Sequence, residues 1–157
     1  MSNRYLVTGG AGFIGSALVR ELLQSGDARV AVVDNMLSGK PANLEEVKDR
    51  VDVNVTDIRE YDTIRPLFDG VDTVFHLAAI PSVPRSIKDP VPSHDVNCNG
   101  TFNVYRAAKE AGVRRVVYAA SSSAYGDTLV LPKVETMAPK PKSPYALQKL
   151  LGFKKYR

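Results

Sequence analysis

The sequence is poor in the residues that form disulfides and metal sites. It has one cysteine among 157 residues, two histidines and no tryptophan. A single cysteine excludes an intramolecular disulfide, which fits a reducing, cytoplasmic compartment. His94 and Cys98 lie four residues apart, but no other histidine or cysteine is near them, so they do not complete a four-ligand zinc site. We therefore expect no metal.

Long apolar runs and clusters of one charge are also scarce. No apolar run approaches the roughly 18 residues of a membrane span, and the N-terminal segment lacks the apolar core of a secretory signal. The net charge is +4, yet the lysines and arginines are scattered and are not interleaved with aromatic residues. We therefore expect neither a membrane nor a nucleic acid as partner. Hydrophobic residues make up 44% of the chain, a share typical of a globular domain.

The first turn is the most informative stretch. A short apolar run from Tyr5 to Thr8 predicts a buried strand, and apolar residues at helical spacing predict a helix over residues 12–24. Between them stand three glycines at a spacing of three, Gly9, Gly12 and Gly15. This layout places backbone N–H groups and a positive helix end against a pyrophosphate. The alternative is a tight turn without a ligand.

The second predicted strand, residues 29–33, ends in Asp34. An acidic residue at this place can accept hydrogen bonds from the adenosine ribose hydroxyls, which favours dinucleotide binding over a turn without a ligand. A carboxylate would also repel a 2′-phosphate, so Asp34 favours NAD over NADP. Arg29 and Lys40 nearby keep NADP open as an alternative.

Strand-like and helix-like segments alternate along the chain. We predict further strands over residues 51–57, 72–79 and 114–120, short helices near 44–48 and 61–70, a long helix over 91–111 and a last helix from about residue 143. The stretch 80–90 has three prolines, so we expect no regular structure there. This order is typical of an α/β fold, a doubly wound parallel sheet of the Rossmann type, and we assign residues 1–157 to one such domain. Polar residues follow the carboxyl ends of the strands, where we expect a single cleft.

The residues suited to catalysis come last. Tyr145 and Lys149 are four residues apart at the start of the last helix, so their side chains share one face. An ammonium beside a phenol favours the phenolate, which makes Tyr145 a credible general base toward an alcohol. Ser121, at the end of the fifth strand, could position the same hydroxyl. Such a pair is common on solvated helices, and the dinucleotide turn is what favours the catalytic interpretation.

With these motifs the sequence resembles the extended short-chain dehydrogenase/reductases, and within them most closely the UDP-N-acetylglucosamine and UDP-glucose 4-epimerases. The resemblance covers residues 4–151 and rests on the motifs, in family order, TGGAGFIG, VVDN, TDIR, HLAA, SVPRS, VNCNGT, SSSAYGD and SPYALQK. It implies an NAD-dependent enzyme that inverts C4 of a UDP-hexose through a 4-keto intermediate, with NAD as its cofactor and a UDP-sugar as its substrate.

The resemblance also implies roles for single residues. Tyr145 would be the base, Lys149 its activator and Ser121 the partner of the reacting hydroxyl. The cofactor-binding residues would be Gly9, Gly12, Phe13, Ile14, Gly15, Asp34, Asn35, Asp57, Ile58, Leu77, Ala78, Ala79, Asn97, Tyr145 and Lys149. The substrate-binding residues would be Ser82, Ser121, Ser122, Ser123 and Tyr145. A homodimer would form through the helices around residues 91–111 and 145–157.

The chain departs from the family pattern at its end. It stops at Arg157, where family members continue, and its ending GFKKYR replaces the usual acidic and aromatic continuation. We interpret the chain as truncated, frame-shifted or a fragment, with the C-terminal substrate-binding part missing. A non-catalytic NAD(P)-binding module or redox sensor of the same fold therefore stays open as an alternative. A 4,6-dehydratase is disfavoured, because Ser122 and Ser123 replace its usual Asp-Glu pair.

Overall fold

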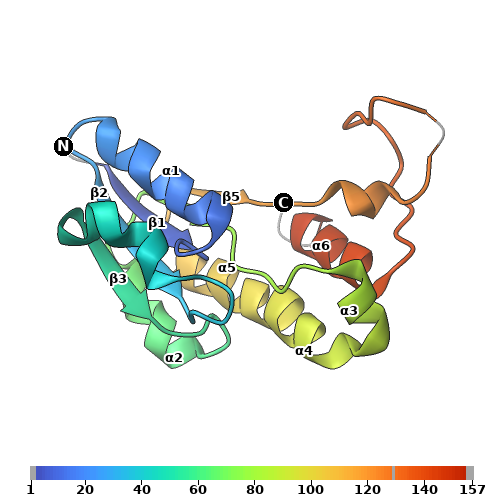
Figure 1. Ribbon diagram of the computed structural model, residues 1–157, viewed down its shortest axis with the longest axis horizontal. Helices are drawn as coiled ribbons and strands as arrows, with labels where there is room; N and C mark the ends of the chain where they lie inside the picture. The colour runs from blue at the N-terminus through green and yellow to red at the C-terminus, as the bar shows by residue number, and fades with distance from the viewer. Residues whose placement is uncertain (1–2, 129, 155–157) are drawn as a thin grey trace. The chain divides into compact units, whose positions relative to one another are not determined.

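The chain forms two compact units (Figure 1). The structure is a computed structural model that describes residues 3–128 and 130–154. Unit 1 comprises residues 1–78 and 100–119 and contains a β-sheet. Unit 2 comprises residues 79–99 and 120–157, and its regular elements are helices. Each unit is described by itself below.

The sheet of unit 1 is fully parallel. Its strands are β1 (Arg4–Thr8), β2 (Arg29–Asp34), β3 (Val51–Val55), β4 (Thr73–His76) and β5 (Arg115–Tyr118), in the spatial order β3-β2-β1-β4-β5. This order confirms the predicted doubly wound α/β fold. The direction of winding reverses between β1 and β4, and in such sheets ligands bind beyond the carboxyl ends of the strands at that reversal. The glycine turn follows β1 directly.

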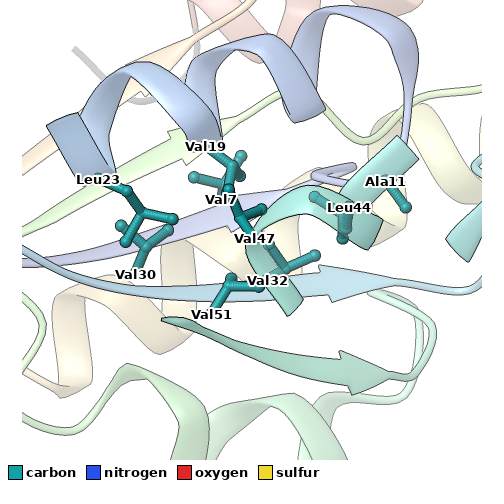
Figure 2. Close-up of a cluster of buried hydrophobic side chains, with 9 residues drawn as sticks. All are labelled: Val7, Ala11, Val19, Leu23, Val30, Val32, Leu44, Val47 and Val51. Carbon is teal, nitrogen blue, oxygen red and sulfur yellow. The ribbon is translucent and has the colours of Figure 1, made fainter. Parts of the chain in front are cut away.

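One face of the sheet is covered by α1 (Phe13–Gln24) and η1 (Pro41–Arg50). Figure 2 shows the side chains that fill this layer: Val19 and Leu23 from α1, Leu44 and Val47 from η1, and Val7, Val30, Val32 and Val51 from the strands. Burying each such side chain stabilises the fold by about 1.5–3 kcal/mol. The helix predicted near residues 44–48 is present as η1, which is a longer 3₁₀ helix that begins at Pro41.

The opposite face carries α2 (Tyr61–Ile64), η2 (Arg65–Phe68) and α5 (Thr101–Glu110) (Figure 1). Ile64, Phe68 and Val104 are fully buried there. A right-handed crossover requires this placement, because the chain changes its winding direction between β3 and β4. β1 lies in the centre of the sheet, so Leu6, Val7 and Thr8 are all fully buried, as a near-continuous apolar strand predicts.

Unit 2 corrects the prediction of an irregular stretch over residues 80–90. Helix α3 (Val83–Lys88) forms inside it. The Ser82 hydroxyl caps this helix by accepting a hydrogen bond from the Arg85 N–H at 3.2 Å. Pro84 stands in the first turn, where a missing N–H breaks no helical bond. The place of Pro84 in the first turn, and not the number of prolines in the stretch, explains why α3 can form.

The predicted single helix over residues 91–111 is also wrong in its detail. The chain is helical there, but in three segments: α4 (Pro90–His94), a π-helical turn η3 (Asp95–Gly100) and α5. A Cβ on Gly100 would lie 2.7 Å from the Ile58 side chain, so the backbone passes close to a neighbouring element at this point. Turns of π-helix are often associated with functional sites, and the buried Asn97 lies in this one.

The last helix, α6 (Pro144–Lys154), begins as predicted. The Ser143 hydroxyl accepts a hydrogen bond from the Ala146 N–H at 3.1 Å, and Pro144 is the first helical residue. Within unit 2, α6 packs against α3, α4 and the short 3₁₀ helix η4 (Ser122–Tyr125). Over the described ranges, no helix is long and apolar enough to cross a membrane.

Candidate active site

The glycine turn of unit 1 has the close backbone approaches that its sequence predicts. Gly9 has a φ of +72°, and its N–H donates to the Val33 carbonyl at 2.7 Å. A Cβ on Gly9 would lie 2.7 Å from the Ala78 backbone nitrogen. A Cβ on Gly15 would lie only 2.1 Å from the Gly9 carbonyl oxygen. Gly9 therefore requires glycine because of its positive φ and the lack of space, and Gly15 requires it because of the lack of space alone.

The turn presents the start of α1 without a side-chain cap. Gly12 precedes the helix, and the first turn carries no acidic residue. Phe13 and Ile14 are 92% and 66% exposed. The N–H groups and the positive end of a helix 12 residues long are thus presented to an anion, which is the arrangement that holds a pyrophosphate. The glycine residues and this open helix end fit a dinucleotide.

Asp34 lies beside the turn and is only 8% exposed. Its Oδ2 accepts a hydrogen bond from the Ala11 N–H and its Oδ1 accepts one from the Met36 N–H, both at 2.9 Å. A carboxylate offers about four acceptor positions, so about two remain for ribose hydroxyls. Asp34 also shapes the loop, because a Cβ on Gly39 would lie 2.8 Å from its Oδ1.

Asp57 forms a second polar cluster next to Asp34 in unit 1. Its carboxylate accepts hydrogen bonds from Asn35 Nδ2 at 2.7 Å and from Arg59 Nε and Nη2 at 3.0 Å each. Partial burial raises the pKa of the Asp57 carboxyl, but the bonds from Arg59 and Asn35 outweigh it and lower the pKa to about 2. The neighbouring Ile58 is buried. The structure brings the predicted adenosine ligands together, and it adds Arg59, which the sequence reasoning missed.

A buried histidine supports the segment behind the glycine turn. His76 is fully buried, with Nδ1 at 2.6 Å from Thr8 Oγ1 and Nε2 at 2.9 Å from Thr101 Oγ1. The Ala78 N–H donates to the same Thr8 hydroxyl at 3.3 Å. His76 therefore connects β1, β4 and α5 and fixes the backbone at Leu77 and Ala78, two of the predicted cofactor contacts. Nothing in the sequence singles out Thr8 or Thr101 for this role.

The predicted catalytic pair lies on α6 in unit 2. The Tyr145 N–H donates to Ser86 Oγ at 3.1 Å, and the Tyr145 side chain is partly exposed. Lys149 is only 4% exposed, and burial lowers the pKa of its ammonium from 10.5 to about 8. The spacing of four residues places Lys149 one helical turn after Tyr145 on α6, and its role beside the Tyr145 phenol stays a prediction.

The predicted substrate residues of unit 2 have structural contacts of their own. Ser121 caps η4, since its Oγ accepts from the Ser123 N–H at 3.3 Å and lies 2.7 Å from Ser123 Oγ. Ser122 is exposed, and its carbonyl accepts a hydrogen bond from Lys133 Nζ at 3.3 Å. Ala79 is half-buried. Ser82, as noted, caps α3.

Asn97, another predicted cofactor contact, is only 1% exposed. Its Nδ2 donates to the Ile80 carbonyl at 3.0 Å and to Gln148 Oε1 at 2.9 Å. Residues 3–128 and 130–154 contain no group of three or more histidine, cysteine and acidic side chains that could hold a metal ion.

The sequence pattern described as "NAD dependent epimerase/dehydratase family" matches residues 5–155. The chain belongs to this family. As a member, it has the cofactor that the glycine turn and Asp34 predict, because the family is defined by its dependence on NAD. The predicted recognition as an epimerase/dehydratase of the short-chain dehydrogenase type is confirmed at this level.

Several relatives of this family member are known. The UDP-glucose 4-epimerase of Mycolicibacterium smegmatis is 42% identical over 153 residues, which is 95% of this chain and 49% of that protein. The crystal structure of the UDP-glucose 4-epimerase from Bifidobacterium longum in complex with NAD⁺ and UDP superposes with a TM-score of 0.93 at 30% identity, covering 99% of this chain and 48% of that one.

The family also includes other chemistries. A dTDP-glucose 4,6-dehydratase from Streptomyces venezuelae, solved with NAD bound, superposes with a TM-score of 0.89 at 37% identity, covering 94% of this chain and 48% of that one. The chain spans about half the length of the relatives it matches. The family and its cofactor are therefore established, while the reaction and the sugar are matters for proposal.

Proposed function

We propose that this chain carries the cofactor-binding and catalytic residues of an NAD-dependent nucleotide-sugar 4-epimerase that inverts C4 of a UDP-hexose. The observation that carries the proposal is the buried Lys149 one helical turn from Tyr145 on α6, in a chain whose glycine turn fits a dinucleotide. The names of the relatives support the reaction, since two of those above are UDP-glucose 4-epimerases.

Each residue has a chemical task in this proposal. When bound, the cofactor would supply the acceptor for the C4 hydride as NAD⁺ and, once reduced to NADH, its donor. Tyr145 removes the proton of the sugar 4-hydroxyl as the C4–H bond breaks, which gives a 4-keto sugar. Lys149 stabilises the Tyr145 phenolate by its charge, and Ser121 orients the hydroxyl by a hydrogen bond. Tyr145 returns the proton to the oxygen when hydride is delivered to the other face of the ketone, so protons and electrons balance over the cycle.

The cofactor is proposed to lie along the glycine turn in unit 1. Gly9, Gly12 and Gly15 and the exposed Phe13 and Ile14 would hold the pyrophosphate at the start of α1. Asp34 and Asn35 would hold the ribose, and Asp57 and Ile58 the adenine. Leu77, Ala78 and Ala79 would line the remainder, with Tyr145 and Lys149 at the reactive end. Ser82, Ser121, Ser122 and Ser123 would contact the sugar.

The epimerase reaction is favoured over the dehydratase reaction of the Streptomyces venezuelae neighbour by one local feature. Dehydration requires an acid and a base beside the tyrosine, and the resemblance places them at positions 122 and 123. Both positions are serine here. A serine hydroxyl does not ionise near neutral pH, so it is a much poorer general acid or base than a carboxyl group.

We also propose that the protein acts as a homodimer through the helices around residues 91–111 and 145–157. Leu147 and Leu151 support this, because they lie on one face of α6 and are 48% and 40% exposed. Sedimentation equilibrium of the purified chain is expected to give twice the monomer mass, and Leu147→Glu is expected to return it to a monomer. A monomer for the unaltered chain at all concentrations would contradict this arrangement.

The proposed reaction is tested with the full chain and two variants. Calorimetry is expected to detect NAD binding, and Asp34→Ala is expected to weaken it by about tenfold or more, the loss of about 1.4 kcal/mol of ribose hydrogen bonding. NMR of UDP-glucose and UDP-galactose mixtures tests for interconversion, which the missing substrate-binding part should make slow and which Tyr145→Phe should slow by a further ~10²–10⁴-fold. NAD binding without any turnover of a UDP-sugar would favour the alternative, a non-catalytic NAD(P)-binding module or redox sensor.

A further inference from the structure

Helix α6 buries polar side chains in unit 2 beside the apolar Ala146. Leu147 and Leu151 are 48% and 40% exposed, whereas Gln148 and Lys149 are only 3% and 4% exposed. A buried amide is costly unless its donors and acceptors are satisfied. The burial of Gln148, directly before Lys149 and three residues after Tyr145, therefore needs a structural explanation.

Gln148 is the middle of a chain of buried hydrogen bonds. Asn97 Nδ2 donates to Gln148 Oε1 at 2.9 Å, and Gln148 Nε2 donates to Ser93 Oγ at 3.1 Å. Ser93 Oγ in turn donates to the Pro90 carbonyl at 3.0 Å. At the other end, Asn97 Oδ1 accepts from the Ile80 N–H at 2.8 Å, and Asn97 Nδ2 also donates to the Ile80 carbonyl at 3.0 Å. Ser93 and Asn97 are 2% and 1% exposed.

The direction of every bond in this chain follows from one backbone group. The Ile80 N–H can only donate, so it fixes which end of the Asn97 amide is the oxygen. The Asn97 NH₂ group then requires an acceptor on Gln148, which orients that amide as well. The Gln148 NH₂ group makes Ser93 Oγ an acceptor and leaves its hydrogen for Pro90. A single arrangement thus satisfies the whole chain, and reversing any one amide would bring two donors or two acceptors together.

The chain of bonds also leaves Asn97 without a free donor. An asparagine amide has two hydrogens, and the Ile80 carbonyl and Gln148 take both. Asn97 therefore serves the fold by linking the Ile80 peptide to α6. The predicted role of Asn97 in lining the cofactor stays a prediction.

We propose that Gln148 is the positioning residue of the catalytic helix: through Asn97 and Ser93 it sets α6, with Tyr145 and Lys149, against the Ile80 peptide and α4. The catalytic meaning of this role rests on the proposed function. Ile80 lies between Ala79 and Ser82, which are predicted to contact cofactor and sugar, and Gln148 lies between Tyr145 and Lys149. One buried network therefore sets the spacing of the residues that must act on the same sugar carbon.

The network has a local consequence at Lys149. Because Gln148 holds α6 inward, the adjacent Lys149 stays away from water, and burial keeps the pKa of its ammonium near 8 instead of 10.5. A change that frees α6 without unfolding the chain should admit water to Lys149. The pKa of Lys149 in the folded chain therefore reports the position of α6. A loss of overall stability alone would not change this pKa.

The test compares Gln148→Met with Gln24→Met in the full chain. Methionine matches glutamine in length but makes no such hydrogen bonds, and Gln24 is the only other glutamine and is exposed on α1. Hydrogen exchange by NMR is expected to show that Gln148→Met lowers the protection of the Ile80 amide by about tenfold, consistent with about one buried hydrogen bond. Titration of ¹³Cε-labelled lysine is expected to place the pKa of Lys149 closer to 10.5. NAD affinity is expected to fall by about tenfold. Gln24→Met should change none of these.

A second variant keeps the test decisive if Gln148→Met does not fold. Ser93→Ala removes the acceptor of Gln148 Nε2 and the donor to the Pro90 carbonyl, while the Ser93 side chain itself bonds neither Ile80 nor Asn97. We expect a smaller loss of Ile80 protection in this variant. Unchanged Ile80 exchange in a folded Gln148→Met or Ser93→Ala variant would overturn the proposal. Exchange and titration are measured without NAD or sugar, so they stand apart from the proposed function, which fails instead if the unaltered chain turns over no UDP-sugar.

Discussion

Two glycines with nearly the same φ angle allow a sharp test of the glycine turn. Gly9 has a φ of +72° and Gly112 a φ of +69°. They differ in their surroundings. A Cβ on Gly9 would lie 2.7 Å from Ala78 N and 2.9 Å from Ala78 Cα, whereas a Cβ on Gly112 would meet nothing within 4 Å. Gly112 ends α5, where the Val113 N–H donates to the Ala108 carbonyl at 2.9 Å.

The two alanine substitutions should therefore differ by the cost of the clash alone. Placing an L-residue in the left-handed region destabilises the folded state by about 1–2 kcal/mol, and this applies to both variants. Forcing a methyl group into packed backbone adds about 1–3 kcal/mol, which only Gly9→Ala incurs. We expect Gly112→Ala to lower the free energy of unfolding by about 1–2 kcal/mol and Gly9→Ala by about 2–5 kcal/mol.

Urea unfolding followed by circular dichroism measures both values, and calorimetry measures NAD binding of each variant at a temperature where it is folded. Gly112→Ala should bind NAD as the unaltered chain does, since Gly112 follows the end of α5 and is not among the predicted cofactor contacts. Gly9→Ala should bind NAD weakly or not at all. Equal losses of stability within about 0.5 kcal/mol, or equal NAD affinities, would refute the assignment of Gly9 as a site of close backbone approach.

Two further predictions follow from the pKa values of the partly buried Asp57 and the buried Lys149. The pKa of Asp57 is lowered from 3.8 to about 2, so its contribution is present above about pH 4 and is lost as the pH falls toward 2. Asp57→Asn should remove at most about 2 kcal/mol of this acid-dependent stability, and less where solvent screens the ion pair with Arg59, in urea titrations at a series of pH values; an unchanged pH profile would contradict it. The pKa of Lys149 is lowered from 10.5 to about 8, so burial of the charged ammonium destabilises the folded state at neutral pH. The free energy of unfolding therefore increases as the pH rises from 8 to 10.5. Lys149→Met should therefore be more stable at pH 7, by at most about 3 kcal/mol, while it loses turnover, and a less stable variant would show that the charge is compensated.

Much of unit 1 could be predicted because its signals are local. The glycine spacing, the apolar strand before it and the acid at the end of β2 lie within a few residues of the contacts they make, and the structure contains those contacts. Ser143 and Pro144 predicted the start of α6 for the same reason, since a cap needs only its own helix. Predictions of this kind depend on backbone stereochemistry and not on distant partners.

The errors arose where distant partners or position decide the outcome. Three prolines suggested an irregular stretch over residues 80–90, but one of them lies in the first turn of α3, where proline is tolerated. The π-helical turn at Asn97 interrupts a helix whose apolar pattern looked continuous. The polar residue three positions after Tyr145 was a usable sign, because a glutamine on the inward face of a helix needs buried partners.

The amino-acid sequence alone was sufficient for the α/β fold, the dinucleotide turn and the spacing of Tyr145 and Lys149. Each of these depends on periodicity or on glycine stereochemistry, which act over a few residues. Folding was required to give Arg59 its place beside Asp57, to connect His76 with two threonines, and to join Ile80, Asn97 and Gln148. The His76 and Gln148 contacts join residues that are far apart in the chain, so local patterns could not predict them. The Arg59 contact with Asp57 spans only two residues, but it depends on the conformation of the loop after β3.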